Sequence, residues 1–321
     1  MQTPPFNDGD HIIRSFISGS GSSLKHIRYS THVIGEDFMN NLNQYCPNLV
    51  SLKLSGKVTS VAFDALNQYP SKIRDLNFDI QNKTSAALDS FTLNAHHFPH
   101  LTSFTIRSDA DLAERVTSRH PTFESPIICL KSLNIYTVTM AGFQSIPEYF
   151  PALSNLTIFK CRHVTNSVVR RLILNLPSLE NMQLSGDSFD DNAFDIPLSR
   201  PHKMLHRLSL TESAGLGEFF IKWIFNSAPK LLWLDISYVP INVTSSMDFS
   251  ELANESKFYP EQLFFLDASF SFENPTILVK LLEALSGLTT LQLVDEDPTI
   301  SMLISETLPK LEIRIREPKQ E

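Results

Sequence analysis

The chain is organised by a short apolar pattern that recurs along nearly its whole length. The pattern is Pro-x-Leu-x-x-Leu-x-Leu, in which other large apolar residues sometimes replace leucine. Self-similarity at a fixed period is the sequence signature of a repeat architecture, in which each unit contacts only its neighbours. The clearest copies occupy residues 47–54, 99–106, 151–158, 177–184 and 229–236.

Weaker copies complete the series, and their spacing identifies the repeat class. From the first copy to the last, successive copies begin on average about 26 residues apart, within the range of about 20–29 that is typical of leucine-rich repeats. The weaker copies begin at Leu24, Ile73, Leu130, Leu205, Leu263, Leu288 and Leu311.

Each copy predicts one short strand followed by a return segment. The last two apolar residues of the pattern are two apart, so in an extended chain they point to one face and the residues between them to the other. Segments with helical spacing follow, at 61–66, 165–176, 218–225 and 276–285, and the next proline ends each of them. Residues placed to cap such helices are Thr59, Thr139 and Thr165.

One strand and one helix cannot bury their apolar faces alone, so neighbouring units must stack. We therefore predict an α/β leucine-rich-repeat solenoid of about twelve repeats, a horseshoe with a parallel β-sheet on the concave face and helices on the convex face. The expected organisation is a cap or partial repeat over 1–23, the solenoid over 24–315, and a polar tail over 316–321. Two repeats are longer than the others, with their extra residues at 108–125 and 239–259. These inserts are either specificity elements or tolerated variation in the length of a solenoid repeat.

Composition and charge narrow the class of partner. Hydrophobic residues make up 42% and charged residues 19%, enough apolar material for a continuous core. The net charge of -8 and the absence of a basic run disfavour nucleic acid. No apolar run approaches the ~20 residues that cross a membrane, and no export signal is visible. The three cysteines, Cys46, Cys129 and Cys161, are far apart and predict a reducing compartment, the cytoplasm or the nucleus.

The sequence lacks the patterns that catalysis or metal binding requires. His96, His97 and His100 are close together, but Pro99 breaks the helix that would align them as ligands. The acids Asp187, Asp190, Asp191 and Asp195 lack the spacing of a calcium loop and indicate a solvated loop with a capping acid. With no glycine-rich phosphate loop and no nucleophile elbow, we expect no enzyme, no metal and no cofactor.

One repeat reads Leu153-x-x-Leu156-x-Ile158-x-x-Cys161-x-x-Val164-Thr165-Asn166-x-x-Val169-x-x-Leu172 and continues to Asn175-Leu-Pro177-x-Leu179. It resembles the cysteine-containing repeat of the F-box/leucine-rich-repeat proteins. The end of the same pattern recurs at Cys46-Pro47-x-Leu49. The resemblance implies an array that holds a target protein while an N-terminal F-box docks onto the adaptor of a Skp/cullin/F-box ubiquitin ligase. Only 23 residues precede the first predicted strand, so no F-box is expected in this chain.

Three functions are compatible with these features. The first is non-catalytic target recognition by an F-box-type ubiquitin ligase receptor or by a relative that lacks the F-box. The second is a free-standing scaffold or inhibitor that occludes its partner. The third, regulation of a GTPase, would need a positioned Arg or Asn, and no motif here marks one.

The strand positions that face the concave surface are mostly polar, with one exception. Trp233 with Asp235, and Phe265 with Asp267, occupy equivalent positions in adjacent repeats beside Arg207. These five residues form the predicted patch, because aromatic residues near charged groups are typical of protein-binding hot spots. In the alternative interpretation, the insert at 239–259 covers the two aromatics and makes them core. A second, weaker aromatic pair in the middle of the array is Tyr136 and Phe159.

Overall fold

The computed structural model consists of two compact units, Met1–Ala152 and Leu153–Glu321, and each is described by itself. The prediction of one solenoid over 24–315 therefore stays a prediction. The structure describes residues 15–67, 72–80, 92–93, 98–108, 122–123, 126–136, 143–160, 164–197, 201–244, 246–256, 259–272, 274–294 and 298–315.

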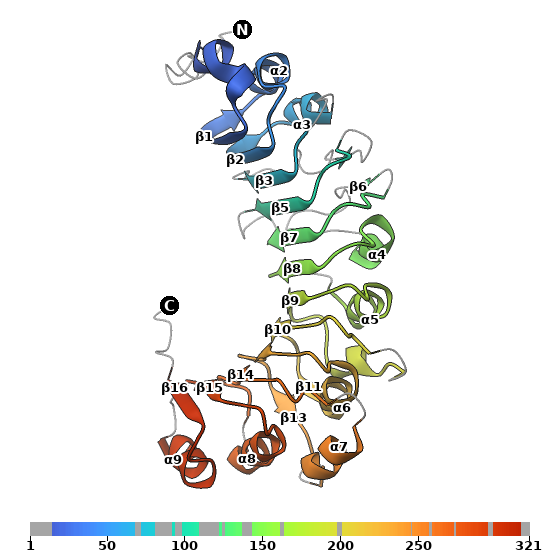
Figure 1. The fold of residues 1–321 in the computed structure, drawn as a ribbon, viewed down its shortest axis with the longest axis vertical. Helices are drawn as coiled ribbons and strands as arrows, with labels where there is room; N and C mark the ends of the chain where they lie inside the picture. Colours follow the sequence, from blue (N-terminus) through green and yellow to red (C-terminus); the bar gives the residue numbers. More distant parts are fainter. Residues whose placement is uncertain are drawn as a thin grey trace. The chain divides into compact units, whose positions relative to one another are not determined.

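In the described part of the first unit, five parallel repeat strands lie side by side in chain order (Figure 1). They are β1 (His26–Ile34), β2 (Ser51–Val58), β3 (Asp75–Ile80), β5 (Ser103–Ser108) and β7 (Ser132–Tyr136). A separate two-stranded sheet pairs β4 (Thr92–Leu93) with β6 (Thr122–Phe123). The helical segments are η1 (Gly21–Ser23), α2 (Glu36–Tyr45), α3 (Ser60–Asn67), η5 (Phe143–Ser145) and α4 (Ile146–Tyr149).

Among the described residues of the second unit, seven parallel repeat strands lie side by side, again in chain order. They are β8 (Asn155–Phe159), β9 (Asn181–Ser185), β10 (Arg207–Thr211), β12 (Trp233–Asp235), β14 (Phe265–Asp267), β15 (Thr290–Leu293) and β16 (Glu312–Ile315). A separate two-stranded sheet pairs β11 (Leu216–Gly217) with β13 (Ile241–Asn242). The helices are α5 (Asn166–Asn175), η6 (Asp191–Phe194), α6 (Glu218–Ser227), α7 (Phe249–Glu255), α8 (Pro275–Ala284) and α9 (Pro298–Thr307).

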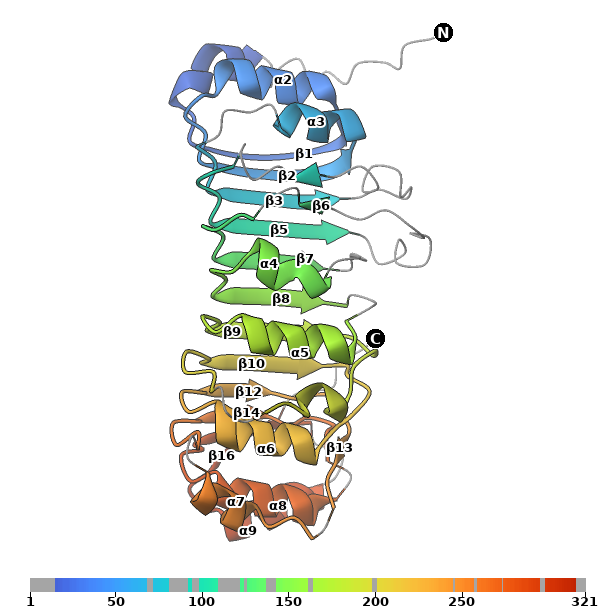
Figure 2. The same cartoon turned by 90° about the vertical axis from the view of Figure 1, so that its right-hand side faces the viewer.

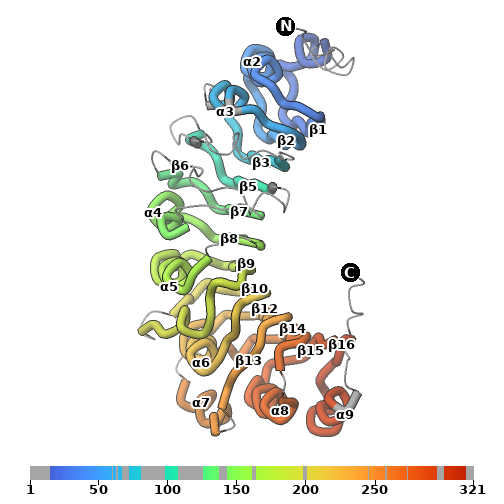
Figure 3. The backbone as a smooth tube through the Cα atoms, turned by 180° about the vertical axis from the view of Figure 1, so that it is seen from behind, coloured from blue at the N-terminus to red at the C-terminus, as the bar shows by residue number. Residues whose placement is uncertain are grey.

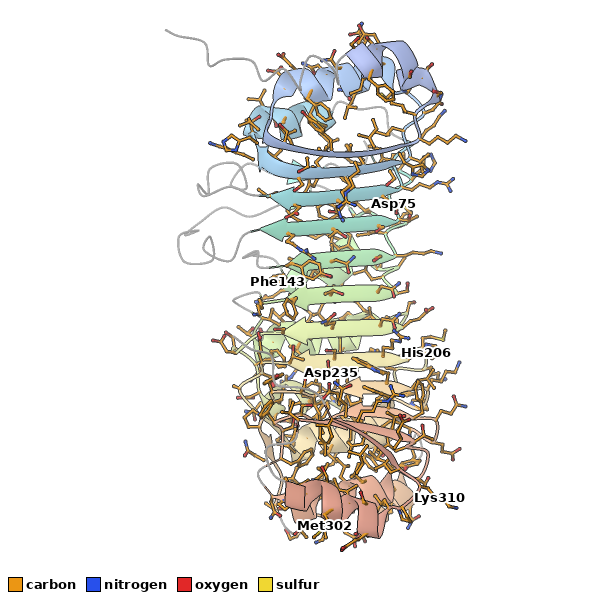
Figure 4. All side chains as sticks on the ribbon, turned by 90° about the vertical axis from the view of Figure 1, so that its left-hand side faces the viewer. Asp75, Phe143, His206, Asp235, Met302 and Lys310 are labelled. Atoms are coloured by element: carbon orange, nitrogen blue, oxygen red, sulfur yellow. The ribbon has the colours of Figure 1, made fainter. Side chains whose placement is uncertain are left out.

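Each unit has two layers, strands on one side and helices on the other (Figure 3). Figure 2 looks onto the helical side, with the helices in front of the strands. Among the described residues, the opposite side of each sheet carries no helix, and we call it the helix-free face (Figure 4). This arrangement of one strand and one return segment per repeat confirms the predicted leucine-rich-repeat fold.

The register of the strands confirms the assignment of faces. The lateral partners Asn155, Asn181, Arg207, Trp233 and Phe265 all stand two residues after the first leucine-type residue of their repeat. The residues that follow them on β8, β9, β10, β12 and β14 are buried under the helical layer, and all are large and apolar. A slip of one residue would exchange these two faces, so the apolar pattern alone determines the register.

The last repeat departs from the pattern by one residue. Its strand begins directly after Leu311, and Glu312 pairs with Thr290 of the preceding strand. The alternation of Ile313 and Ile315 explains the difference, because this register places both isoleucines beside the buried Leu291 and Leu293.

The predicted helix caps are realised at one threonine and not at another. Thr59 accepts a hydrogen bond from the backbone N–H of Ala62, 3.3 Å from its Oγ1, as a capping residue does. Thr165 occupies the N-cap of α5, but its hydroxyl lies 3.0 Å from Oγ of Ser167 and caps no backbone group, so that prediction is wrong. The Thr165 hydroxyl contacts the Ser167 hydroxyl in place of a backbone N–H group of the helix. Thr139 lies outside the described residues.

The acid-rich segment of 187–195 joins neighbouring repeats. Asp190 caps η6 by accepting from the N–H of Asn192 at 2.8 Å, which confirms the predicted capping acid. Asp191 reaches the next repeat, where its carboxylate accepts from the N–H groups of Gly217, Phe219 and Phe220 at 2.8 to 3.1 Å. A negative group at the N-terminus of α6 satisfies donors that the helix cannot pair and complements its dipole.

The insert at 239–259 belongs to the helical layer. It contributes β13 and α7, and its last residue, Tyr259, packs on the ring of Phe225 with centroids 5.4 Å apart. The Tyr259 hydroxyl also donates to the carbonyl of Ala284. The alternative in which this insert covers Trp233 and Phe265 is therefore wrong. Of the insert at 108–125, only Ser108 and β6 lie within the described residues.

We expect Leu156→Ala to lower the free energy of unfolding by about 2–5 kcal/mol, because the side chain is buried in a well-packed layer. The matched control is Thr157→Ala on the helix-free face, for which we expect a change of about 0.5 kcal/mol. Urea denaturation followed by circular dichroism measures both. Equal losses for the two variants would contradict the observed register.

A buried histidine makes the stability of the second unit depend on pH. His202 lies edge-on to Trp223, and its Nε2 is within hydrogen-bond distance of the carbonyl of Ile173. Since a carbonyl can only accept, Nε2 carries the proton, and burial lowers the pKa of the ring. The other ring nitrogen, Nδ1, is buried and has no hydrogen-bond partner among the described atoms.

The sign of this pH dependence follows from linkage. In the unfolded chain His202 titrates near pH 6.5, whereas in the folded chain its pKa is lower. Below about pH 6.5 the unfolded chain binds a proton that the folded chain does not, so the free energy of unfolding falls as the pH falls toward the folded pKa. We expect His202→Gln to reduce this decline, and the half-exposed control His206→Gln to preserve it. Urea denaturation at about pH 7.5 and pH 5.5 provides the comparison, and an undiminished decline in His202→Gln would contradict the assignment.

Candidate protein-binding surface

The helix-free face of the second unit carries two stacked aromatic residues. Trp233 of β12 and Phe265 of β14 are lateral partners, and their rings lie 5.4 Å apart at an interplanar angle of 7°. Both side chains are half-buried. Arg207 is the partner of Trp233 on the other side, and it is exposed. The structure therefore brings together the two aromatics and the arginine of the predicted patch, whose role in partner binding stays a prediction.

The two carboxylates of the predicted patch hold the ends of the strands. Asp235, labelled in Figure 4, accepts through Oδ1 from the N–H and the hydroxyl of Ser237 at 3.0 and 2.7 Å. Its Oδ2 accepts from the hydroxyl of Ser209 on the neighbouring strand at 3.0 Å. Both oxygens therefore have partners inside the chain.

Asp267 repeats this arrangement in a more buried position. Only 4% of the residue is exposed, and its Oδ1 accepts from the N–H and the hydroxyl of Ser269 at 3.1 and 2.7 Å. Its Oδ2 accepts from Nε2 of Gln292 at 2.8 Å. A buried carboxylate needs such donors to offset its lost hydration. The sequence analysis placed Asp267 on the exposed surface of the predicted patch. The structure corrects this, because the residue is buried and presents no exposed carboxylate.

A second aromatic stack lies at the other end of the same strands. Tyr238 and Phe270 stand five residues after Trp233 and Phe265, and their rings lie 4.9 Å apart at 30°. They are exposed by 41% and 39%. We name the two stacks the entry stack (Trp233 and Phe265) and the exit stack (Tyr238 and Phe270), after the ends of the strands on which they lie.

The sequence analysis missed the exit stack, although a signal was present. Residues 233–238 read Trp-Leu-Asp-Ile-Ser-Tyr and residues 265–270 read Phe-Leu-Asp-Ala-Ser-Phe. Both segments have the form aromatic-Leu-Asp-x-Ser-aromatic. The Asp-x-Ser turn directs the chain out of the strand, so the final aromatic no longer follows the alternation on which the strand analysis relied.

The exit stack has a left-handed backbone. Tyr238 and Phe270 have φ of 60° and 57°, and Lys160 and Glu212 have the same conformation at the ends of β8 and β10. This region costs a residue with a side chain roughly 1–2 kcal/mol relative to glycine. Lys160 and Glu212 form an exposed ion pair, with 3.7 Å between nitrogen and oxygen. Backbone outliers of this kind gather at functional sites, where the surrounding structure compensates for the cost.

The second predicted aromatic pair is divided between the two units. Tyr136 belongs to the first unit, where the guanidinium of Arg107 lies 4.5 Å from the centre of its ring. Phe159 belongs to the second, where Nζ of Lys160 lies 5.7 Å from the ring centre. Each ring thus has a cation beside it, whereas the pairing of the two rings stays a prediction.

Other candidate sites are weaker. A pocket of about 270 Å³ lies where α8 and α9 end, lined mainly by leucines with Glu283 and Lys310 as its charged groups. This volume is at the lower limit of ligand sites, which reach roughly 300–1,000 Å³. Across the described ranges no three metal-ligating side chains gather and no helix is long and apolar enough to cross a membrane. His96, His97 and Cys161 lie outside those ranges.

Comparison with known proteins gives a likeness of fold. No family model matches the chain, and no curated protein matches its sequence. The yeast complex of Rad7 and Elc1 contains a chain with a TM-score of 0.55 and 16% sequence identity, over 91% of this chain and 74% of that one. The leucine-rich repeat-containing protein LegL7 from Legionella pneumophila has a TM-score of 0.35 and 14% identity, over 91% of both chains.

The left-handed position of the exit stack can be tested with a pair of variants. Tyr238→Ala and Tyr238→Gly both remove the ring, so both lose the contact with Phe270. Glycine adopts a φ of 60° without a steric cost, so we expect Tyr238→Gly to be more stable than Tyr238→Ala by about 1 kcal/mol. Urea denaturation measures the difference. Alanine equal to or better than glycine would contradict the conformation.

Together the strand register, the helical layer and the repeat pattern establish what kind of molecule this is: the chain has the leucine-rich-repeat fold.

Proposed function

We propose that the chain is a non-catalytic recognition module that binds a partner protein on the helix-free face of its second unit. The observation that carries the proposal is the presence of two aromatic stacks, one on the adjacent strands β12 and β14 and one just after these strands end. Four aromatic side chains lie at the two ends of these strands, outside the buried layer. Aromatic residues with an arginine beside them are the commonest anchors of protein interfaces.

The carboxylates and the aromatic rings of the site have different contacts, and this difference supports a rigid recognition surface. Asp235 and Asp267 are occupied by donors within the chain, so they fix the ends of the strands. The aromatic rings are held by stacking and need little ordering when a partner arrives. A side chain that is already ordered loses less conformational entropy on binding, and the affinity is correspondingly higher.

We further propose that the partner is the target of a ubiquitin ligase, and that the chain acts as the target-recognition array of an F-box-type receptor or of a relative without the F-box. The repeat at 153–172, with its resemblance to the F-box/leucine-rich-repeat proteins, supports this assignment. The fold shared with a chain from the Rad7–Elc1 complex is compatible with it. Such a module would act in the cytoplasm or the nucleus, the compartments that the cysteine content predicts.

We expect Trp233→Ala to weaken partner binding by about 30-fold or more, which corresponds to roughly 2 kcal/mol for the loss of an anchor. The matched control is Phe219→Ala, because Phe219 is an exposed aromatic on α6 in the helical layer. The partner is first captured from an extract of the cells that make the protein, and its dissociation constant is then measured with purified components. A loss that Phe219→Ala shares, or no loss in Trp233→Ala, would remove the helix-free face from the proposal.

The ligase assignment has a separate readout. If the chain is a receptor subunit, a cullin-ligase adaptor co-purifies with wild-type protein and equally with Trp233→Ala, because the adaptor would not bind the aromatic face. Recovery of a partner that depends on Trp233, without any adaptor, would instead indicate the free-standing scaffold or inhibitor. These two results distinguish the ligase role from the binding role.

A further inference from the structure

Arg207 is the charged residue of the candidate surface whose side chain has no partner in the described part of the chain. It is exposed on the helix-free face, as the lateral partner of Trp233. Its guanidinium takes part in no hydrogen bond or ion pair with any described residue. A guanidinium is a planar fork of N–H donors that stays charged at physiological pH. Arg207 therefore presents a free set of donors directly beside the entry stack.

The acidic side chains on the same face are engaged elsewhere. The two aspartates of the predicted patch accept from serine and glutamine donors within the chain. Glu212, which follows β10, accepts from the Ser185 hydroxyl at 2.8 Å and lies 3.7 Å from Nζ of Lys160. The positive charge of Arg207 is thus left for a group outside the chain.

Further basic side chains lie where β10 and β12 begin. Lys203 and Lys230 are exposed in the turns that lead into these strands, and His206, labelled in Figure 4, directly precedes β10. Within the described ranges none of these three side chains has a hydrogen bond or an ion pair. Glu180 directly precedes β9 and Glu261 lies in the turn before β14, so the basic region is confined to two strands. In a chain of net charge -8, this local reversal of charge favours an acidic group on the partner.

The spacing of the strands sets the distance between the arginine and the aromatic rings. Arg207, Trp233 and Phe265 are lateral partners on three successive strands. With about 4.8 Å between strands, the backbone at the middle of the entry stack lies roughly 7 Å from that of Arg207. In an extended segment, residues two positions apart are also roughly 7 Å apart and point to the same side. A segment that crosses these strands can therefore place an acidic side chain on Arg207 and an apolar side chain on the entry stack.

We propose that the partner binds through an extended segment in which an aspartate or glutamate contacts Arg207 and an apolar residue two positions away packs on the entry stack. This inference rests on the proposed function, because it names the chemistry of the partner that binds the same face. A carboxylate matches the fork of a single guanidinium through two parallel hydrogen bonds.

A phosphate group fits this site less well than a carboxylate. It carries roughly two negative charges, and domains that recognise it use clusters of arginines. Among the described residues on the helix-free face of β9, β10, β12 and β14, Arg207 is the only arginine. The flanking Glu180 and Glu261 would repel the larger charge more strongly.

A phage-displayed library of random peptides tests the recognition pattern, with the full chain as bait. We expect wild-type protein to enrich peptides with an acidic residue two positions from an aromatic or aliphatic one. Arg207→Glu should lose the acidic preference and keep the apolar one, whereas Trp233→Ala should lose the apolar one. The matched control is Lys222→Glu, an equal change of charge at an exposed site on α6, and it should select the same peptides as wild type.

A synthetic copy of an enriched peptide then isolates the charged contact by calorimetry. Replacing its acidic residue with the uncharged amide should weaken binding to wild-type protein by about tenfold. With Arg207→Gln the same replacement should change the dissociation constant less than about twofold, because the two substitutions remove the same contact. Equal weakening with both proteins would overturn the pairing, and tighter binding of a phosphoserine peptide would overturn the choice of a carboxylate.

The outcomes separate this inference from the proposed function. Peptides that depend on Trp233 but show no acidic preference would overturn the inference and leave the proposed function standing. Peptides that Trp233→Ala selects as well as wild type does would count against both. If no peptide is enriched, the extended segment is overturned, whereas the captured partner still decides the proposed function through its own dependence on Trp233.

Discussion

Lateral pairing of short parallel strands in one fixed register is the constraint on which this structure depends. Each repeat strand has only three to nine residues, too few to be stable without its neighbours. Pairing aligns the large apolar residues of successive repeats into continuous buried rows, such as Leu156, Met182, Leu208 and Leu234. The helices then pack on these rows, and the opposite face is left to polar and aromatic residues.

Connections between repeats reinforce this pairing at the ends of the elements. Asp191 caps the helix of the next repeat, and Asp235 and Asp267 bind the serines with which their own strands turn away from the sheet. These carboxylates are acceptors for backbone N–H and side-chain donors that would otherwise have no partner near the surface. In a repeat protein such hydrogen bonds between neighbouring repeats determine how accurately each repeat stacks on the next.

The acidic and the aromatic residues of the predicted patch have different contacts in the structure. The carboxylates are occupied within the chain, and the aromatic side chains are what the surface of β12 and β14 presents. Recognition by this surface would therefore depend on apolar contact and on Arg207.

The sequence by itself determined the repeat class, the start of eleven of the twelve repeat strands and the face of each residue on them, because an extended chain alternates with a period of two and leaves no other way to bury leucine. It also determined that Trp233, Phe265 and Arg207 would be neighbours. Only the tertiary structure decided that Asp267 is buried, that the insert at 239–259 joins the helical layer, and that Tyr238 stacks on Phe270. These outcomes depend on hydrogen bonds and turns between repeats, contacts that a pattern read along one strand does not contain.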